Sequence, residues 1–412
     1  MRIFVSLILF SSVFTAAAQS RRVVAGGSPS ATSSVASTPD QTVKEMFDEA
    51  NSYNKVKFAE FEQKKVAYTD RLRLQTEREQ KQLAAKYASA VSTRSNLSGD
   101  DLYYLGLLNW IAENLDGTAS AFTKYLTGTE LPIDRVQTVR SVLTVVYAKQ
   151  KKFDDALKIR DTYLKATPNK ASDRFRFEGE LAKSYFADKA FAKAVSFAEE
   201  AYKAAKLILV DPTIKNRGLD ETLDAGMLVF ECYRELSDVK AADASLDEMR
   251  ATAIAIGSPS FFYYAADKLI TYQIETGRKS LALQTWEAAK NQAEKDLIPK
   301  GPQNEAVQRL KKREAHYKML GETAPELPMV DNWFPGTPRT LADLRGKVVL
   351  LDFWATWCGP CFDAFPHLAE WHQDLSSEGL VILGVTRYYG RAEGFDVDKE
   401  HEIAFLKRFK VQ

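Results

Sequence analysis

A pair of cysteines separated by two residues constrains this chain more than any other feature. Cys358 and Cys361 are two of the three cysteines among 412 residues. The apolar run 347–353 before them has the length of a buried strand, and the pattern of 362–375 after them predicts a helix. One side of that helix is expected to carry Phe365, Leu368, Ala369 and His372. The pair is therefore expected where a strand ends and a helix begins.

This placement indicates a reactive thiol. The first turn of a helix has backbone N–H groups without partners and carries the positive end of the helix dipole. A cysteine there loses its proton more easily, and the thiolate is the reactive form. We expect Cys358 to be the attacking sulfur. Cys361, one turn further along, is expected to attack the mixed disulfide and release the product.

Two other interpretations of the pair stay open. A zinc site needs about four ligands, and neither Cys232 nor the histidines form a ligand-spaced set with the pair; the histidines are His316, His367, His372 and His401. A purely structural disulfide is the second alternative. The strand–CxxC–helix context favours redox chemistry without a metal or cofactor. Cys232, in the apolar run 227–233, is expected to be a buried and inert thiol.

The segment 351–361, Leu-Asp-Phe-Trp-Ala-Thr-Trp-Cys-Gly-Pro-Cys, resembles the active-site segment of thioredoxins. The stretches 321–325 and 340–349 resemble the TlpA/ResA-like branch of that superfamily, which is exported. The resemblance covers residues 321–412. It implies an α/β thioredoxin-like domain that exchanges disulfides with protein substrates and is served by an upstream thiol–disulfide partner, with no cofactor.

The resemblance also implies roles for individual residues. Asp352 lies where thioredoxins carry a buried acid, and it would shuttle the proton of Cys361. Trp357 would shield the disulfide and contact partners, while Trp354 would pack beneath the active-site helix. Gly359 and Pro360 shape the first helical turn, where a proline sacrifices no hydrogen bond. In the family, Gly-Pro at this place accompanies reductases more often than strong oxidants.

The sequence departs from the family after the next predicted strand, 380–385, and helix, 397–410. A thioredoxin fold also needs a cis-proline loop, the strands around it and a final helix, whereas this sequence ends 51 residues after Cys361. We interpret residues 321–412 as a thioredoxin-like domain that is incomplete at its C-terminus.

The N-terminus has the pattern of an export signal. Arg2 precedes an apolar core, and small residues end the segment 1–18. A membrane anchor is the alternative, although the apolar run is short for a membrane span. No later run is long and apolar enough, so no stable span is expected after cleavage. The prediction is a periplasmic or extracytoplasmic protein, and the Ser/Ala/Thr-rich residues 19–40 are interpreted as a flexible linker.

Residues 41–96 are helical in composition and predict a helical hairpin packed on the next domain, with a short coiled coil as the alternative. Residues 97–297 carry a weak repeat in which an aromatic residue precedes a small one by nine positions. The pairs are Trp110 and Ala119, Tyr147 and Ala156, Tyr185 and Ala194, and Tyr233 and Ala242. The unit 135–168 resembles a tetratricopeptide repeat. The residues 298–320 are interpreted as a linker and short helix, with Lys311 to Arg313 on a solvated face.

The predicted fold is therefore multidomain: an all-α, tetratricopeptide-like solenoid followed by the thioredoxin-like domain. The net charge of +1 gives no reason to expect nucleic-acid binding. The leading hypothesis is an exported thiol–disulfide oxidoreductase that reduces protein partners docked on its helical region. The alternatives are a protein-interaction scaffold with a vestigial thioredoxin domain, and a peroxidase. The peroxidase hypothesis is weakened by the CxxC, since peroxiredoxins hold their reactive cysteine in a different setting.

Overall fold

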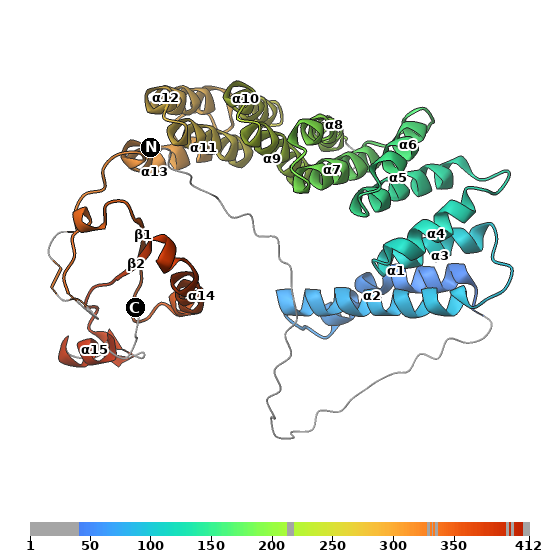
Figure 1. Cartoon of the computed structure of the whole chain (residues 1–412), viewed down its shortest axis with the longest axis horizontal. Helices are drawn as coiled ribbons and strands as arrows, with labels where there is room; N and C mark the ends of the chain where they lie inside the picture. The colour runs from blue at the N-terminus through green and yellow to red at the C-terminus, as the bar shows by residue number, and fades with distance from the viewer. Residues whose placement is uncertain are drawn as a thin grey trace, which may run out of the picture. The chain divides into compact units, whose positions relative to one another are not determined.

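The structure, a computed structural model, describes residues 41–211, 218–327, 330–331, 333, 337–392, 395–396 and 399–406. The predicted export signal 1–18 and linker 19–40 lie outside these ranges. The chain divides into two compact units, residues 1–139 and 140–412, each of which is built around its own elements (Figure 1). In the described part of the chain, no helix has both the length and the hydrophobicity needed to cross a bilayer.

The first unit is helical. Its helices are α1 (Val43–Gln63), α2 (Asp70–Ser92), α3 (Asp100–Ile111) and α4 (Leu115–Tyr125). Thr42 caps α1 through a reciprocal pair of hydrogen bonds with Glu45, so the helix begins where the sequence supplies a capping box. The hydroxyl of Tyr87 on α2 donates to Glu49 on α1 at 2.7 Å. Helices α1 and α2 therefore form a hairpin, and both pack on α3.

The second unit continues the helical series. Its helices are α6 (Phe153–Leu164), α7 (Ala171–Ala187), α8 (Phe191–Leu209), α9 (Leu219–Glu235), α10 (Val239–Ala255), α11 (Pro259–Glu275), α12 (Lys279–Asp296) and α13 (Glu305–Met319). Helix α5 (Ile133–Lys149) crosses the boundary between the units. From α7 onward, successive helices pack on one another and share a continuous apolar core.

The five helical hairpins from α3/α4 to α11/α12 end their first helix in the same way. The second residue after the end of each first helix takes a left-handed conformation. These residues are Glu113, Lys151, Lys189, Ser237 and Gly277. The N–H group of the following residue then donates to a carbonyl five positions back, on Asn109, Tyr147, Tyr185, Tyr233 and Gln273. This local turn closes the last helical turn and reverses the chain. It gives the repeat a register that does not depend on loop length.

Nine residues after each of those carbonyl residues lies a small side chain that is fully buried. These residues are Thr118, Ala156, Ala194, Ala242 and Ala282. A small residue at this point lets the two helices of a hairpin approach closely. The predicted pair Trp110 and Ala119 was wrong by one position, because the equivalent residues are Asn109 and Thr118. Asn109 replaces the aromatic residue and is held by its own hydrogen bonds to Leu105 and Asn114.

Helix α13 packs on α11 and α12. Its buried side chains are Ala306, Val307, Leu310 and Tyr317. The indole N–H of Trp286 on α12 donates to the carbonyl of Leu310 at 3.0 Å. Arg313 is bound to Asp267 at 3.0 Å, so the predicted solvated face holds for Lys311 and Lys312 and is wrong for Arg313. Helix α13 covers the end of the helical series with an apolar face.

The C-terminal part is an α/β unit. Its sheet pairs β1 (Val348–Phe353) with β2 (Leu380–Val385) in parallel, and α14 (Gly359–Leu375) connects the two strands. The smaller elements are the 3₁₀ turns η1 (Ala342–Leu344) and η2 (Ser376–Glu378), the antiparallel pair β3 (Arg391–Ala392) and β4 (Phe395–Asp396), and α15 (Lys399–Leu406). A mostly helical chain that ends in an α/β unit of this kind confirms the predicted fold class.

Two details of this unit differ from the predictions. Strand β1 was expected to be buried, yet Val348 and Phe353 at its ends are each 69% exposed, because β1 pairs with β2 alone among the described residues. On α14, Phe365, Leu368 and His372 are partly buried as predicted, whereas Ala369 is exposed. The partly buried face of the helix is therefore narrower than the pattern of apolar residues predicted.

Candidate active site

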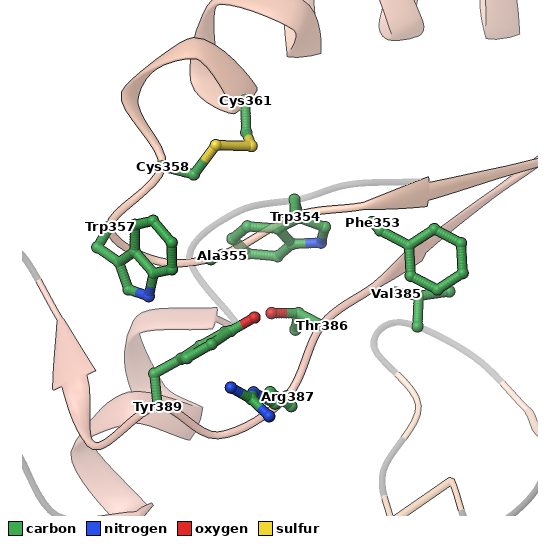
Figure 2. A pocket seen from close by; sticks show the side chains of 10 residues that line it. All are labelled: Phe353, Trp354, Ala355, Trp357, Cys358, Cys361, Val385, Thr386, Arg387 and Tyr389. Atoms are coloured by element: carbon green, nitrogen blue, oxygen red, sulfur yellow. A yellow bond between two sulfur atoms is a disulfide. The ribbon is translucent and has the colours of Figure 1, made fainter. Parts of the chain in front are cut away.

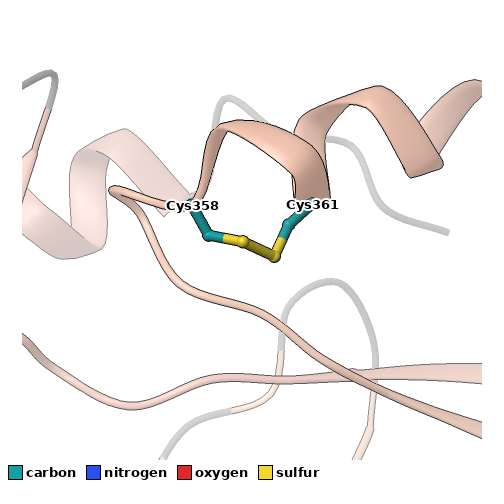
Figure 3. The surroundings of a disulfide bond; sticks show 2 residues. All are labelled: Cys358 and Cys361. Atoms are coloured by element: carbon teal, nitrogen blue, oxygen red, sulfur yellow. A yellow bond between two sulfur atoms is a disulfide. The ribbon is translucent and has the colours of Figure 1, made fainter.

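The two cysteines lie at the start of α14. Cys358 is the N-cap residue and Cys361 is in the first turn, where its N–H group donates to the carbonyl of Cys358 at 3.1 Å. Their Cα atoms lie 5.3 Å apart and their sulfur atoms form a disulfide (Figure 3). Gly359 and Pro360 open the helix, and the fixed φ of a proline suits that position. Both cysteines are partly exposed, as exchange with another disulfide requires.

Trp354 forms the floor beneath the pair. It is 8% exposed, and its ring meets the ring of Phe365 on α14 edge to face, with centroids 5.3 Å apart. Phe362 on the same helix adds a second edge contact at 6.3 Å. The chain leaves β1 and turns under the helix here, so the first turn of α14 rests on an aromatic base. This fixes the position of the cysteines relative to the sheet.

A hollow of about 350 Å³ opens beside the disulfide (Figure 2). Its walls come from the end of β1, the first turn of α14 and the segment that follows β2. The lining residues are Phe353, Trp354, Ala355, Trp357, Cys358, Cys361, Val385, Thr386, Arg387 and Tyr389. Trp357 is 61% exposed, so it stands at the edge of the hollow as an accessible aromatic surface.

Sequence reasoning missed the part of the wall contributed by Thr386, Arg387 and Tyr389. These residues follow the carboxyl end of β2, which lies beside the carboxyl end of β1 because the two strands are parallel. Ligands of open α/β sheets bind at that edge. The end of the predicted strand 380–385 was thus the available signal for this half of the site.

Asp352 lies on β1 opposite Gly384 on β2 and is partly buried. It does not line the hollow. The structure thus brings Cys358, Cys361, Trp354 and Trp357 together around the hollow. Asp352 lies on β1 next to Phe353 and outside the lining of the hollow. A proton-shuttling role for Asp352 stays a prediction.

The third cysteine is remote from this chemistry. Cys232 lies on α9, is fully buried and forms no disulfide. Burial raises the pKa of its thiol to about 12, with a smaller contribution from the charges of Glu231 and Glu235. Such a thiol is a poor nucleophile. In the described ranges no three His, Cys, Asp or Glu side chains gather as a metal site would require.

Comparison with known proteins agrees with this geometry over the same region. Residues 320–391 match the AhpC/TSA family. The C-terminal part of this chain is a thioredoxin-like domain of that family. Over 66 residues it is 47% identical to the protein DipZ of Mycobacterium tuberculosis, a match that spans 15% of this chain and 10% of DipZ. The helical region precedes this domain and lies outside these matches.

Two further relatives carry a functional name. The thiol-disulfide oxidoreductase ResA of Bacillus subtilis is 40% identical over 65 residues, which is 16% of this chain and 35% of ResA. ResA of Geobacillus kaustophilus is 39% identical over 66 residues, which is 16% of this chain and 37% of that protein. The chain thus spans between about a tenth and about two fifths of the length of these curated relatives.

One solved structure covers more of the chain with weaker similarity. The crystal structure of BtubC (BKLC) from P. vanneervenii covers 72% of this chain and all of its own, with a TM-score of 0.32 and 14% sequence identity. This likeness is too low to support a statement about fold or function.

Proposed function

We propose that this protein is a thiol–disulfide oxidoreductase that reduces disulfides of protein partners through Cys358 and Cys361. The observation that carries the proposal is the position of the pair: a disulfide at the first turn of a helix, partly exposed and facing a hollow with an accessible aromatic edge. A purely structural disulfide has no need of that hollow. The similarity to ResA supports the same chemistry.

In the reduced protein, the Cys358 thiolate attacks one sulfur of a substrate disulfide. The substrate S–S bond breaks, its other sulfur leaves as a thiolate and takes up a proton, and Cys358 becomes joined to the substrate. Cys361 then loses its proton and attacks the sulfur of Cys358. This second exchange expels the remaining substrate sulfur as a thiolate, which takes up a proton, so the substrate is released as a dithiol. The substrate has gained two electrons, and Cys358 and Cys361 have lost two and are joined as a disulfide.

The residues around the pair assist in different ways. The positive end of the α14 dipole stabilises the Cys358 thiolate. Asp352 accepts the proton of Cys361 during the second exchange. Trp357 covers the sulfurs against solvent and contacts the partner. Gly359 and Pro360 set the turn that holds both sulfurs within bonding distance.

Each cycle leaves the pair oxidised, so an upstream dithiol protein reduces it again. The sequence pattern of residues 1–18 supports export to a periplasmic or extracytoplasmic compartment, where disulfides form and persist. The tetratricopeptide-like helical region supplies a surface for recruiting substrates. Neither a cofactor nor a metal has a part in this cycle.

Reduction of insulin by dithiothreitol, followed by the precipitation of its free B chain, tests the proposal. We expect the protein to accelerate the reaction and the variant Cys358→Ser to leave it at the uncatalysed rate. Cys232→Ser is the matched control, because it removes a thiol that the mechanism does not use. Equal rates with the wild type and Cys358→Ser would reject the proposal.

A further inference from the structure

The wall of the hollow opposite the disulfide is built by residues that the proposed exchange does not use. Figure 2 shows Cys358 and Cys361 on one side of the hollow and Arg387 on the other. Tyr389 reaches toward Trp357, and the two rings meet edge to face with centroids 5.7 Å apart. A second aromatic surface therefore faces the one beside the cysteines.

Arg387 is held against that aromatic surface. Its guanidinium carbon lies 4.9 Å from the centroid of the Tyr389 ring, within the range of a cation–π contact. The contact limits the positions that the long side chain can take. A guanidinium carries five N–H donors, so those that do not face the ring can bind a ligand.

Arg387 is also the one charged residue among the ten described residues that line the hollow. It is exposed, and within the described ranges no ion pair engages it. Arginines of the helical region do have carboxylate partners, as Arg313 has Asp267 and Arg278 has Asp243. An arginine that is oriented by a ring and left without a carboxylate beside a reactive disulfide has the features of a binding group for an anion.

We propose that Arg387 and Tyr389 form a recognition subsite for an acidic side chain that lies beside the attacked cysteine of a disulfide-bearing polypeptide. The aromatic rings of Trp357 and Tyr389 contact the polypeptide, and the guanidinium pairs with its Asp or Glu carboxylate. The inference rests on the proposed function and adds the substrate class. It makes Arg387 a specificity-determining residue, and the chemistry stays with the cysteines.

Three cyclic peptides of one sequence test this subsite. Each holds a single disulfide and carries Glu, Gln or Lys beside the same cysteine. The protein is reduced, freed of reductant and mixed with each peptide, and the rate of peptide dithiol formation is measured by chromatography. We expect the wild type to prefer the Glu peptide over the Lys peptide by about three- to tenfold, the range for one partly exposed ion pair and the matching repulsion.

The variants are compared by the ratio of Glu-peptide to Lys-peptide rates, because this ratio cancels any change in the reactivity of Cys358 itself. Arg387→Glu should invert the preference and Arg387→Lys should keep most of it. Arg345→Glu is the matched control, since Arg345 is an exposed arginine outside the hollow, and its ratio should equal that of the wild type. At 1 M salt the wild-type ratio should fall towards one, because the screening length shrinks to about 3 Å.

The outcomes separate this inference from the proposed function. If the wild type reduces all three peptides at one rate, or if Arg387→Glu keeps the wild-type ratio, the acidic subsite is rejected while the exchange chemistry stands. If the wild type reduces no peptide faster than Cys358→Ser does, the proposed function fails and the subsite fails with it.

Discussion

Cys358 and Cys361 occupy unequal positions on the same helix, although one disulfide joins them. Cys358 precedes the first helical residue, whereas Cys361 already lies within the first turn and donates its N–H group back to the carbonyl of Cys358. Cys358 therefore lies at the positive end of the helix dipole, one turn before Cys361. On this asymmetry we propose that Cys358 attacks and that Cys361 resolves the mixed disulfide.

Serine substitutions should separate the two roles. With Cys361→Ser, the Cys358 thiolate still attacks a substrate disulfide, and the mixed disulfide then accumulates because no resolving thiol is present. With Cys358→Ser, no stable adduct should form. Gel shifts without reductant, reversed by dithiothreitol, measure both. An adduct that forms equally well with Cys358→Ser would contradict the assignment.

The two tryptophans of the site should differ in what they support. Trp354 is 8% exposed and packs on Phe362 and Phe365, so Trp354→Ala leaves a cavity and should destabilise the domain by about 3 kcal/mol or more. Trp357 is 61% exposed, so Trp357→Ala should change stability little and lower the rate of exchange. Hydrogen exchange of β1 and β2 reports stability without relying on indole fluorescence. Similar protection in both variants would argue against a supporting role for Trp354.

A buried ion pair connects the α5/α6 hairpin to the α7/α8 hairpin. Glu178 on α7 is fully buried, and both of its oxygens accept hydrogen bonds from Nε of Arg160 on α6 at 2.9 Å. Arg160→Met leaves the buried Glu178 carboxylate without its arginine partner and should destabilise the helical region by about 3–5 kcal/mol. The double variant Arg160→Met, Glu178→Leu removes the buried charge as well and should recover most of that loss.

An exposed pair in the same region provides the control. Lys318 and Glu314 lie one turn apart on α13 and are largely solvent-exposed, so Lys318→Met should leave the unfolding midpoint almost unchanged. Chemical unfolding followed by far-ultraviolet circular dichroism compares the four proteins. The ion pair would have no structural importance if the single and double variants unfolded together with the wild type.

The sequence predicted those parts of the site that depend on neighbours along the chain. Strand β1, helix α14 and the cysteine pair are each specified by a short local pattern, and strand β2 has the predicted bounds. The half of the hollow formed by Arg387 and Tyr389 depends instead on how two parallel strands place their ends together. No local pattern in 386–390 marks that contact, so it required the sheet register.

The helical region shows the same division. The repeat was visible where tyrosines mark it, at Tyr147, Tyr185 and Tyr233, and it was displaced or missed where Asn109 and Gln273 take that place. Its common feature is a backbone turn, which different side chains can satisfy. Arg313 was assigned to solvent because its neighbours in the sequence are lysines, whereas its partner Asp267 comes from α11, 46 residues away.

The buried thiol gives a prediction that depends on pH. The folded protein holds Cys232 with its pKa raised to about 12, whereas in the unfolded chain it ionises near its ordinary value of 9.0. Between these two pH values the thiol is neutral in the folded state and ionised in the unfolded chain. Its contribution to stability is therefore complete below pH 9.0 and declines as the pH rises to about 12. The wild type should lose stability over that interval more steeply than Cys232→Ala does.

Thiol counting checks the burial itself. After reduction of the pair, Ellman's reagent should react quickly with two thiols in the native protein, and with a third only after unfolding by guanidinium chloride. The variant that carries both Cys358→Ser and Cys361→Ser isolates Cys232, and its native form should react slowly at neutral pH because the thiolate is scarce and enclosed by α9 and its neighbours. A rapid reaction in that native variant would show that Cys232 is accessible, and it would reopen the question of a third redox thiol.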